Sequence, residues 1–229
     1  MRECLLAESG GFDFGALTGA LLTAAAVIGV SYLGWRLKQK EAAALRTWAA
    51  RYGYHYERRD DSAMSVSSAP PFGTGNDPKC TDVFRGTYKN TRVLFFQYEY
   101  KPVSQHQSSS ATYQVVAIGL PSSLPLLDIG RERFLARRGE DIDFENQRFN
   151  DAFKIQSPDR RFAFDVIHPR TMEWMLADRR TRSYQWRFEG PWLMSYRLGE
   201  IDLEDVFARA DFLLDIRAQV PGHVWSSRA

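Results

Sequence analysis

Hydrophobic and polar positions divide the chain into one long apolar run near its start and a remainder with shorter periodic patterns. Between Phe14 and Trp35, no side chain is ionisable. As a helix, a run of this length measures about 33 Å, which matches a hydrocarbon core of about 30 Å. The pattern therefore predicts a transmembrane helix over residues 14–35, with the rings of Tyr32 and Trp35 at its C-terminal interface.

Three other interpretations fit this run less well. Ala24-Ala25-Ala26 suggests a cleaved signal peptide, but three acids and one arginine precede the run, and the apolar pattern continues for nine more residues. A lipoprotein anchor is disfavoured because Cys4 precedes the apolar stretch. A buried helix of a soluble domain is disfavoured because the run has no polar face.

Flanking charge predicts the orientation of the span. The first 13 residues carry one arginine and three acids, a net charge of −2, whereas residues 36–51 carry five cations and one acid, a net charge of +4. The positive side stays in the cytoplasm. The chain is thereby divided into an extracytoplasmic N-terminus 1–13, a span 14–35, a juxtamembrane helix 36–52, a cytosolic domain 53–222 and a tail 223–229.

The two ends of the span carry the candidate binding residues. At its cytoplasmic end we expect a membrane-interface set, Trp35, Arg36, Lys38 and Lys40. These cations either contact anionic headgroups, at about 1 kcal/mol each, or serve only as positive-inside flanking. Within the span, small residues four apart predict a helix-dimer face and hence a possible homodimer, formed by Gly15, Gly19 and Thr23.

The remainder of the chain predicts an α+β domain with a mostly antiparallel sheet. Alternating apolar positions indicate strands over 54–58, 81–89, 92–101, 112–120, 124–129 and 153–156. Asn90-Thr91 is expected to turn the second and third of these strands into a hairpin. A last hairpin, 184–188 and 192–198, is expected to turn at Gly190-Pro191 and to gather its aromatic side chains on one face.

Helices are predicted in the C-terminal half. Ser157 is expected to cap a first helix, with Pro158 at its first position. Residues 170–179 are expected to form a second helix, and Asp202 is expected to cap a final helix. The apolar stripe of this last helix is expected to lie across the aromatic face of the sheet, with Leu203, Val206, Phe207, Ala210, Leu213 and Leu214. The predicted order of elements, a sheet followed by a closing C-terminal helix, is similar to that of pleckstrin-homology-like modules. The similarity is one of element order alone.

Composition and motifs exclude several classes of protein. Hydrophobic residues make up 44% of the chain and charged residues 25%, which excludes a disordered chain. Two cysteines exclude a disulfide scaffold, and a net charge of +2 excludes a strongly basic nucleic-acid binder. The four histidines lie in different predicted elements, and no nucleophile elbow, Walker loop or zinc-protease motif is present. We therefore expect no catalytic set, no cofactor and no metal. We also expect Cys80 to be structural and the alternating Asp141, Asp143 and Glu145 to be solvated.

Three segments carry a resemblance to single-span actinobacterial membrane proteins of unknown function. They are Trp48-Ala-Ala-Arg-Tyr-Gly-Tyr, Phe149-Asn-Asp-Ala-Phe-Lys-Ile and Phe162-Ala-Phe-Asp-Val-Ile-His-Pro. The resemblance implies no activity and no site residue. The leading hypothesis is a membrane-anchored protein whose cytosolic, non-enzymatic domain binds a protein partner. The alternatives are a lipid or small-ligand module held at the bilayer and an enzyme of an unfamiliar type.

Overall fold

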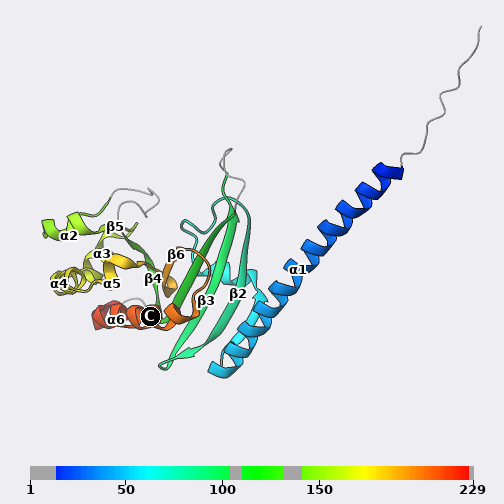
Figure 1. Cartoon of the computed structure of the whole chain (residues 1–229). Helices are drawn as coiled ribbons and strands as arrows, with labels where there is room; N and C mark the ends of the chain where they lie inside the picture. The colour runs from blue at the N-terminus through cyan, green and yellow to red at the C-terminus, as the bar shows by residue number, and fades with distance from the viewer. Residues whose placement is uncertain (1–13, 104–109, 131–140, 227–229) are drawn as a thin grey trace, which may run out of the picture. The chain divides into compact units, whose positions relative to one another are not determined.

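The computed structural model describes residues 14–103, 110–130 and 141–226 (Figure 1). Side-chain surroundings are described for these residues other than 14–24, 26 and 38. The chain divides into two compact units, residues 1–45 and residues 46–229. The first unit contains most of helix α1, and the second contains the α+β domain. The predicted N-terminus 1–13 lies outside the described residues.

Helix α1 runs without interruption over 39 residues, Phe14–Tyr52. The segments predicted as a span and as a juxtamembrane helix are therefore parts of one helix. In the part of α1 that belongs to the first unit, large apolar side chains are exposed, namely Val27, Ile28, Val30, Leu33, Trp35 and Leu37. Among the described residues, no helix combines the length and the apolar character needed to cross a membrane.

The domain is built on one six-stranded antiparallel sheet, as the sequence predicts. Its strands are β1 His55–Arg59, β2 Asn76–Tyr88, β3 Thr91–Lys101, β4 Ala111–Gly130, β5 Lys154–Gln156 and β6 Gln185–Leu198. They pair in the order β1-β2-β3-β4-β5, and β6 pairs with β4 along its other edge. The β2–β3 turn is centred on Lys89 and Asn90, both with positive φ, one residue before the predicted turn.

Two long bent strands replace elements that the sequence predicts as separate. Residues 112–120 and 124–129 belong to the single strand β4, and the predicted hairpin around Gly190-Pro191 is the single strand β6. Gly190, at φ +57°, pairs with Leu124 inside the ladder, where the register shifts. The hairpin prediction was wrong because a glycine–proline bend interrupts an alternating pattern just as a chain reversal does.

The bend also separates the aromatic side chains of β6. Trp192 and Tyr196 lie in a core cluster with Phe72 and Phe96, on the side that the 3-10 helix η1 (Asp61–Val66) contacts. Trp186 lies against Phe212 of helix α6 (Leu203–Gln219). The prediction of one aromatic face was therefore wrong: each side of the sheet receives part of the set, because a shift of one residue moves side chains to the opposite face.

Short helices complete the domain, and those over residues 160–166 and 222–226 contact β4. The short helices are α2 Gln147–Ala152, α3 Arg160–Val166, α4 Pro169–Ala177, α5 Arg180–Ser183 and α7 Gly222–Ser226. Asp159 caps α3 by accepting from the Phe162 amide at 2.9 Å, so the prediction that Ser157 is this cap was wrong. Ser157 donates instead to the Leu126 carbonyl, at 2.6 Å. Asp202 does cap α6.

The buried face of α6 agrees with the predicted stripe in part. Val206, Ala210 and Leu213 are buried, whereas Phe207 and Leu214 are half-buried. Arg209 and Phe212, which the apolar pattern does not select, are fully buried. The helix is therefore rotated from the orientation that apolar residues alone would choose.

We expect Gly86→Ala to destabilise the domain by about 1–3 kcal/mol, because an added methyl overpacks a filled site. A Cβ at Gly86 would lie 2.4 Å from Cδ1 of Tyr54, whose ring is held by neighbouring rings. Chemical denaturation followed by tryptophan fluorescence measures this change. Gly222→Ala is the matched control, since a Cβ there meets nothing within 4 Å; equal stabilities of the two variants would contradict the packing argument.

Candidate functional site

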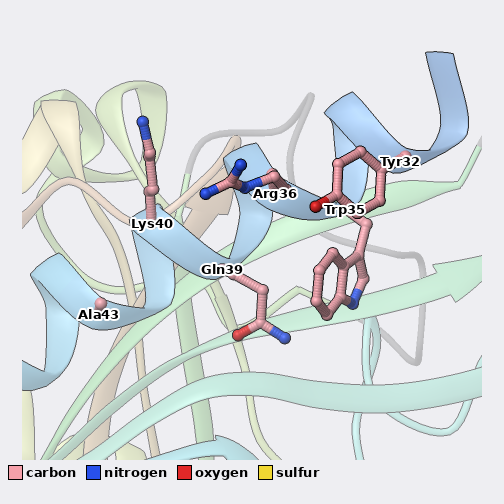
Figure 2. Close-up of a pocket in the computed structure, with 6 residues that line it drawn as sticks. All are labelled: Tyr32, Trp35, Arg36, Gln39, Lys40 and Ala43. Carbon is pink, nitrogen blue, oxygen red and sulfur yellow. The ribbon is translucent and has the colours of Figure 1, made fainter. Parts of the chain in front are cut away.

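Six side chains of α1 line a shallow hollow on one face of the helix (Figure 2). They are Tyr32, Trp35, Arg36, Gln39, Lys40 and Ala43. At 100° per residue, positions three and four apart fall on the same face, which explains how one helix assembles the set. The hollow brings together three of the four predicted interface residues. The fourth, Lys38, lies outside the side chains that the structure describes.

The aromatic and cationic groups of the hollow contact one another. The rings of Tyr32 and Trp35 stack with their centroids 6.0 Å apart, and the Arg36 guanidinium lies 5.9 Å from the Tyr32 centroid. Both rings are more than half exposed, so they present apolar surface beside a positive charge. Gln39 and Ala43 were not predicted, although Gln39 follows Arg36 by three residues and Ala43 follows Gln39 by four, a spacing that could have found them.

The predicted helix-dimer face lies on the same helix. Gly15, Gly19 and Thr23 all fall within α1, but their side-chain surroundings lie outside the described part of the structure.

The last turns of α1 belong to the domain core. Trp48 lies 5.8 Å from the rings of Tyr54 and Phe207 and meets Phe84 and Phe95 edge-on. Gly53, at φ +73°, ends the helix, and the amide of Tyr54 donates to the Ala49 carbonyl at 2.8 Å. The helix that begins in the apolar run therefore ends as part of the aromatic packing of the sheet.

A buried ion pair joins the two long strands. Arg187 of β6 is 1% exposed and bonds its register partner Asp128 of β4. The Tyr196 hydroxyl lies 2.9 Å from the guanidinium and donates to Asp128 at 3.1 Å. Burial raises the pKa of Asp128, while Arg187 and the Tyr196 hydroxyl oppose that shift. The pair holds the ladder together where the strands bend.

The same guanidinium holds the loop that follows η1. It donates to the hydroxyl of Ser67 at 2.7 Å and to the carbonyls of Ala69 and Pro70 at 2.9 and 2.7 Å. Glu189 completes the attachment by accepting from the Ser67 hydroxyl at 2.5 Å and from the Ser68 amide at 2.9 Å. These contacts are internal to the protein, so they fasten the loop to the sheet.

A second buried arginine lies between α6 and the opposite face of the sheet. Arg209 is fully buried and donates to Gln114 at 3.0 Å and to Ser195 at 3.2 Å. Burial lowers the pKa of Arg209 to about 10, with Asp205 opposing the shift. Tyr184 donates to Asp205 at 2.8 Å. The cluster fixes the rotation of α6 on the sheet.

Other candidate chemical groups are occupied or enclosed. Cys80 is fully buried, and burial raises the pKa of its thiol to about 12, which keeps it protonated at neutral pH. Asp141 lies 3.7 Å from Lys154 and accepts from Gln156 at 3.1 Å. Within the described residues, no group of three or more histidine, cysteine or acidic side chains is arranged to hold a metal ion.

Comparison with known proteins gives one informative likeness. No protein-family model and no curated protein matches this chain. Among solved structures, the chain is similar to the crystal structure of the mycobacterial trehalose monomycolate transport factor A, TtfA. The TM-score is 0.53 at 14% identity, over 78% of this chain and 90% of the other. The likeness shows a shared α+β fold.

We expect Asp128→Asn to destabilise the domain by about 3–5 kcal/mol, because it leaves the buried Arg187 charge without its partner. The paired change Asp128→Leu with Arg187→Met should recover part of that loss. Lys101→Gln is the control; it breaks an exposed pair with Asp77, and should cost less than about 1 kcal/mol. Thermal denaturation in one buffer measures all variants. A fully tolerated Asp128→Asn would contradict this role.

Proposed function

We propose that this chain is a single-pass membrane protein whose α+β domain lies in the cytoplasm and acts by binding a partner rather than by catalysis. One observation carries the proposal. A single helix, Phe14–Tyr52, runs from the uncharged segment into the domain, where its last turns supply Trp48 to the core. Such a helix is suited to anchor the domain.

The residues of α1 support the anchor. The segment 14–35 has no acidic or basic residue, and the described part of it exposes Val27, Ile28, Val30 and Leu33. Exposed apolar surface all round a helix is favourable in lipid and unfavourable in water. The net charge of +4 over residues 36–51 supports a cytoplasmic C-terminal side.

The buried charges support a binding role for the domain. Arg187 holds the Ser67 loop onto the sheet, and Arg209 holds α6 against it. Both guanidinium groups therefore stabilise the fold. Because both guanidinium groups are engaged within the fold, the proposal assigns recognition of a partner to the outer surface of the domain.

A lipid or small-ligand module held at the membrane is the second candidate. The fold likeness to a transport factor for trehalose monomycolate, which is a lipid, favours it. Mass spectrometry of the chain purified in detergent separates the two candidates. The lipid-module candidate predicts that a stoichiometric lipid stays bound after extensive detergent washing. The protein-partner candidate predicts that detergent replaces all of the retained lipid. A chain truncated after residue 45 is the control for lipid that is held only by α1.

The anchor and its orientation are tested on the full-length chain. We expect the chain to stay in the membrane pellet after alkaline carbonate extraction. A tag at the C-terminus should resist protease added to intact cells and become cleavable once the cells are opened. A tag of the same sequence at the N-terminus, cleavable in intact cells, is the control. Release by carbonate, or external cleavage of the C-terminal tag, would contradict the proposal.

A further inference from the structure

We propose that the hollow on α1 binds the headgroup of an anionic phospholipid of the cytoplasmic leaflet. This inference rests on the proposed membrane anchoring and adds a ligand to it. It goes beyond positive-inside flanking, because it requires the cations to lie on one particular face of the helix, beside the two aromatic rings (Figure 2).

The charges of the hollow are arranged on one face. Arg36 and Lys40 are four residues apart and both line the hollow. Glu41, the one acid between residues 36 and 51 of the sequence, is turned by about 140° from Arg36 and about 100° from Lys40. The face with the two cations therefore carries no carboxylate. A guanidinium fork and an ammonium one turn apart suit the oxygens of a phosphate diester.

The aromatic rings lie on the side of the hollow that is nearer the predicted span. Tyr32 and Trp35 precede Arg36 and Lys40 along the helix, and the rise from Tyr32 to Lys40 is about 12 Å. A phospholipid has the same order with depth, since its apolar acyl chains lie inside, its glycerol esters lie at the boundary and its phosphate lies outside. Tyrosine and tryptophan rings favour that boundary. The order of aromatic and cationic groups along the hollow therefore matches the order of apolar and charged groups in one lipid molecule.

This match favours a lipid over a free phosphate. The stacked rings of Tyr32 and Trp35 are both more than half exposed. Inorganic phosphate would contact the cations but would leave this apolar surface in water. A lipid covers the rings and satisfies the charges together, and the amide of Gln39, which also lines the hollow, is a further donor. The ligand class is therefore an anionic glycerophospholipid.

The full-length chain in proteoliposomes tests the proposal. Electron spin resonance measures the fraction of spin-labelled phosphatidylglycerol, and separately of spin-labelled phosphatidylcholine, that the protein immobilises. We expect a preference for phosphatidylglycerol that falls by about fivefold or more in the variant Arg36→Gln with Lys40→Gln. Arg160→Gln with Arg161→Gln is the matched control. It removes the same charge from exposed positions of helix α3 and should keep the preference.

A relocated variant separates a site from simple flanking charge. It combines Arg36→Gln and Lys40→Gln with Glu41→Lys, which restores the net charge at an exposed position turned about 140° from Arg36 and about 100° from Lys40. We expect the preference to stay lost. Full recovery would overturn the proposal, because charge alone would then suffice. A wild-type chain that resists carbonate but prefers neither lipid would also overturn it, and would leave the proposed anchoring intact.

Discussion

The pairing of β4 with β6 on both sides of their bend is the constraint on which the rest of the domain depends. The ladder runs from Tyr113 opposite Leu198 to Ile129 opposite Trp186 and passes through a shared bend. The first part of β4 also pairs with β3, and its last residues pair with β5. Because one strand joins both parts of the sheet, the bend decides which side chains meet η1 and which meet α6. The Asp128–Arg187 pair then fixes that geometry from within.

The two buried arginines show how charge is used to specify this fold. Arg187 is bonded to a carboxylate, a tyrosine hydroxyl and the loop after η1, so its burial is offset by many charge-assisted contacts. Arg209 donates to two neutral partners, Gln114 and Ser195, and its Nε lies 4.0 Å from the carboxylate of Asp205. An apolar contact tolerates sliding, whereas these directional bonds favour one placement of loop and helix. The bonds of Arg187 lie beside the register shifts of the β4–β6 ladder, where they favour one pairing of the two strands.

Helix α1 connects the proposed membrane segment to that sheet. Its first unit exposes apolar side chains and the basic hollow, and its last turns pack Trp48 among the rings of Tyr54 and Phe207. The helix therefore changes surroundings along its length while its backbone continues unchanged. The proposed lipid anchoring, the proposed headgroup recognition and the packing of Trp48 are assigned to three consecutive stretches of this helix.

The sequence by itself determined the helix over residues 14–52 as two adjoining segments, the α+β class, the β2–β3 hairpin, the cap at Asp202 and three residues of the hollow. These features depend on local periodicity and on neighbours three or four residues apart. Tertiary structure alone decided that Gly190-Pro191 bends a strand, that Trp186 and Trp192 contribute to opposite sides of the sheet, and that Arg187 and Arg209 are buried. Strand pairing and buried ion pairs join residues far apart in the chain, and no local pattern records which distant partner each will find.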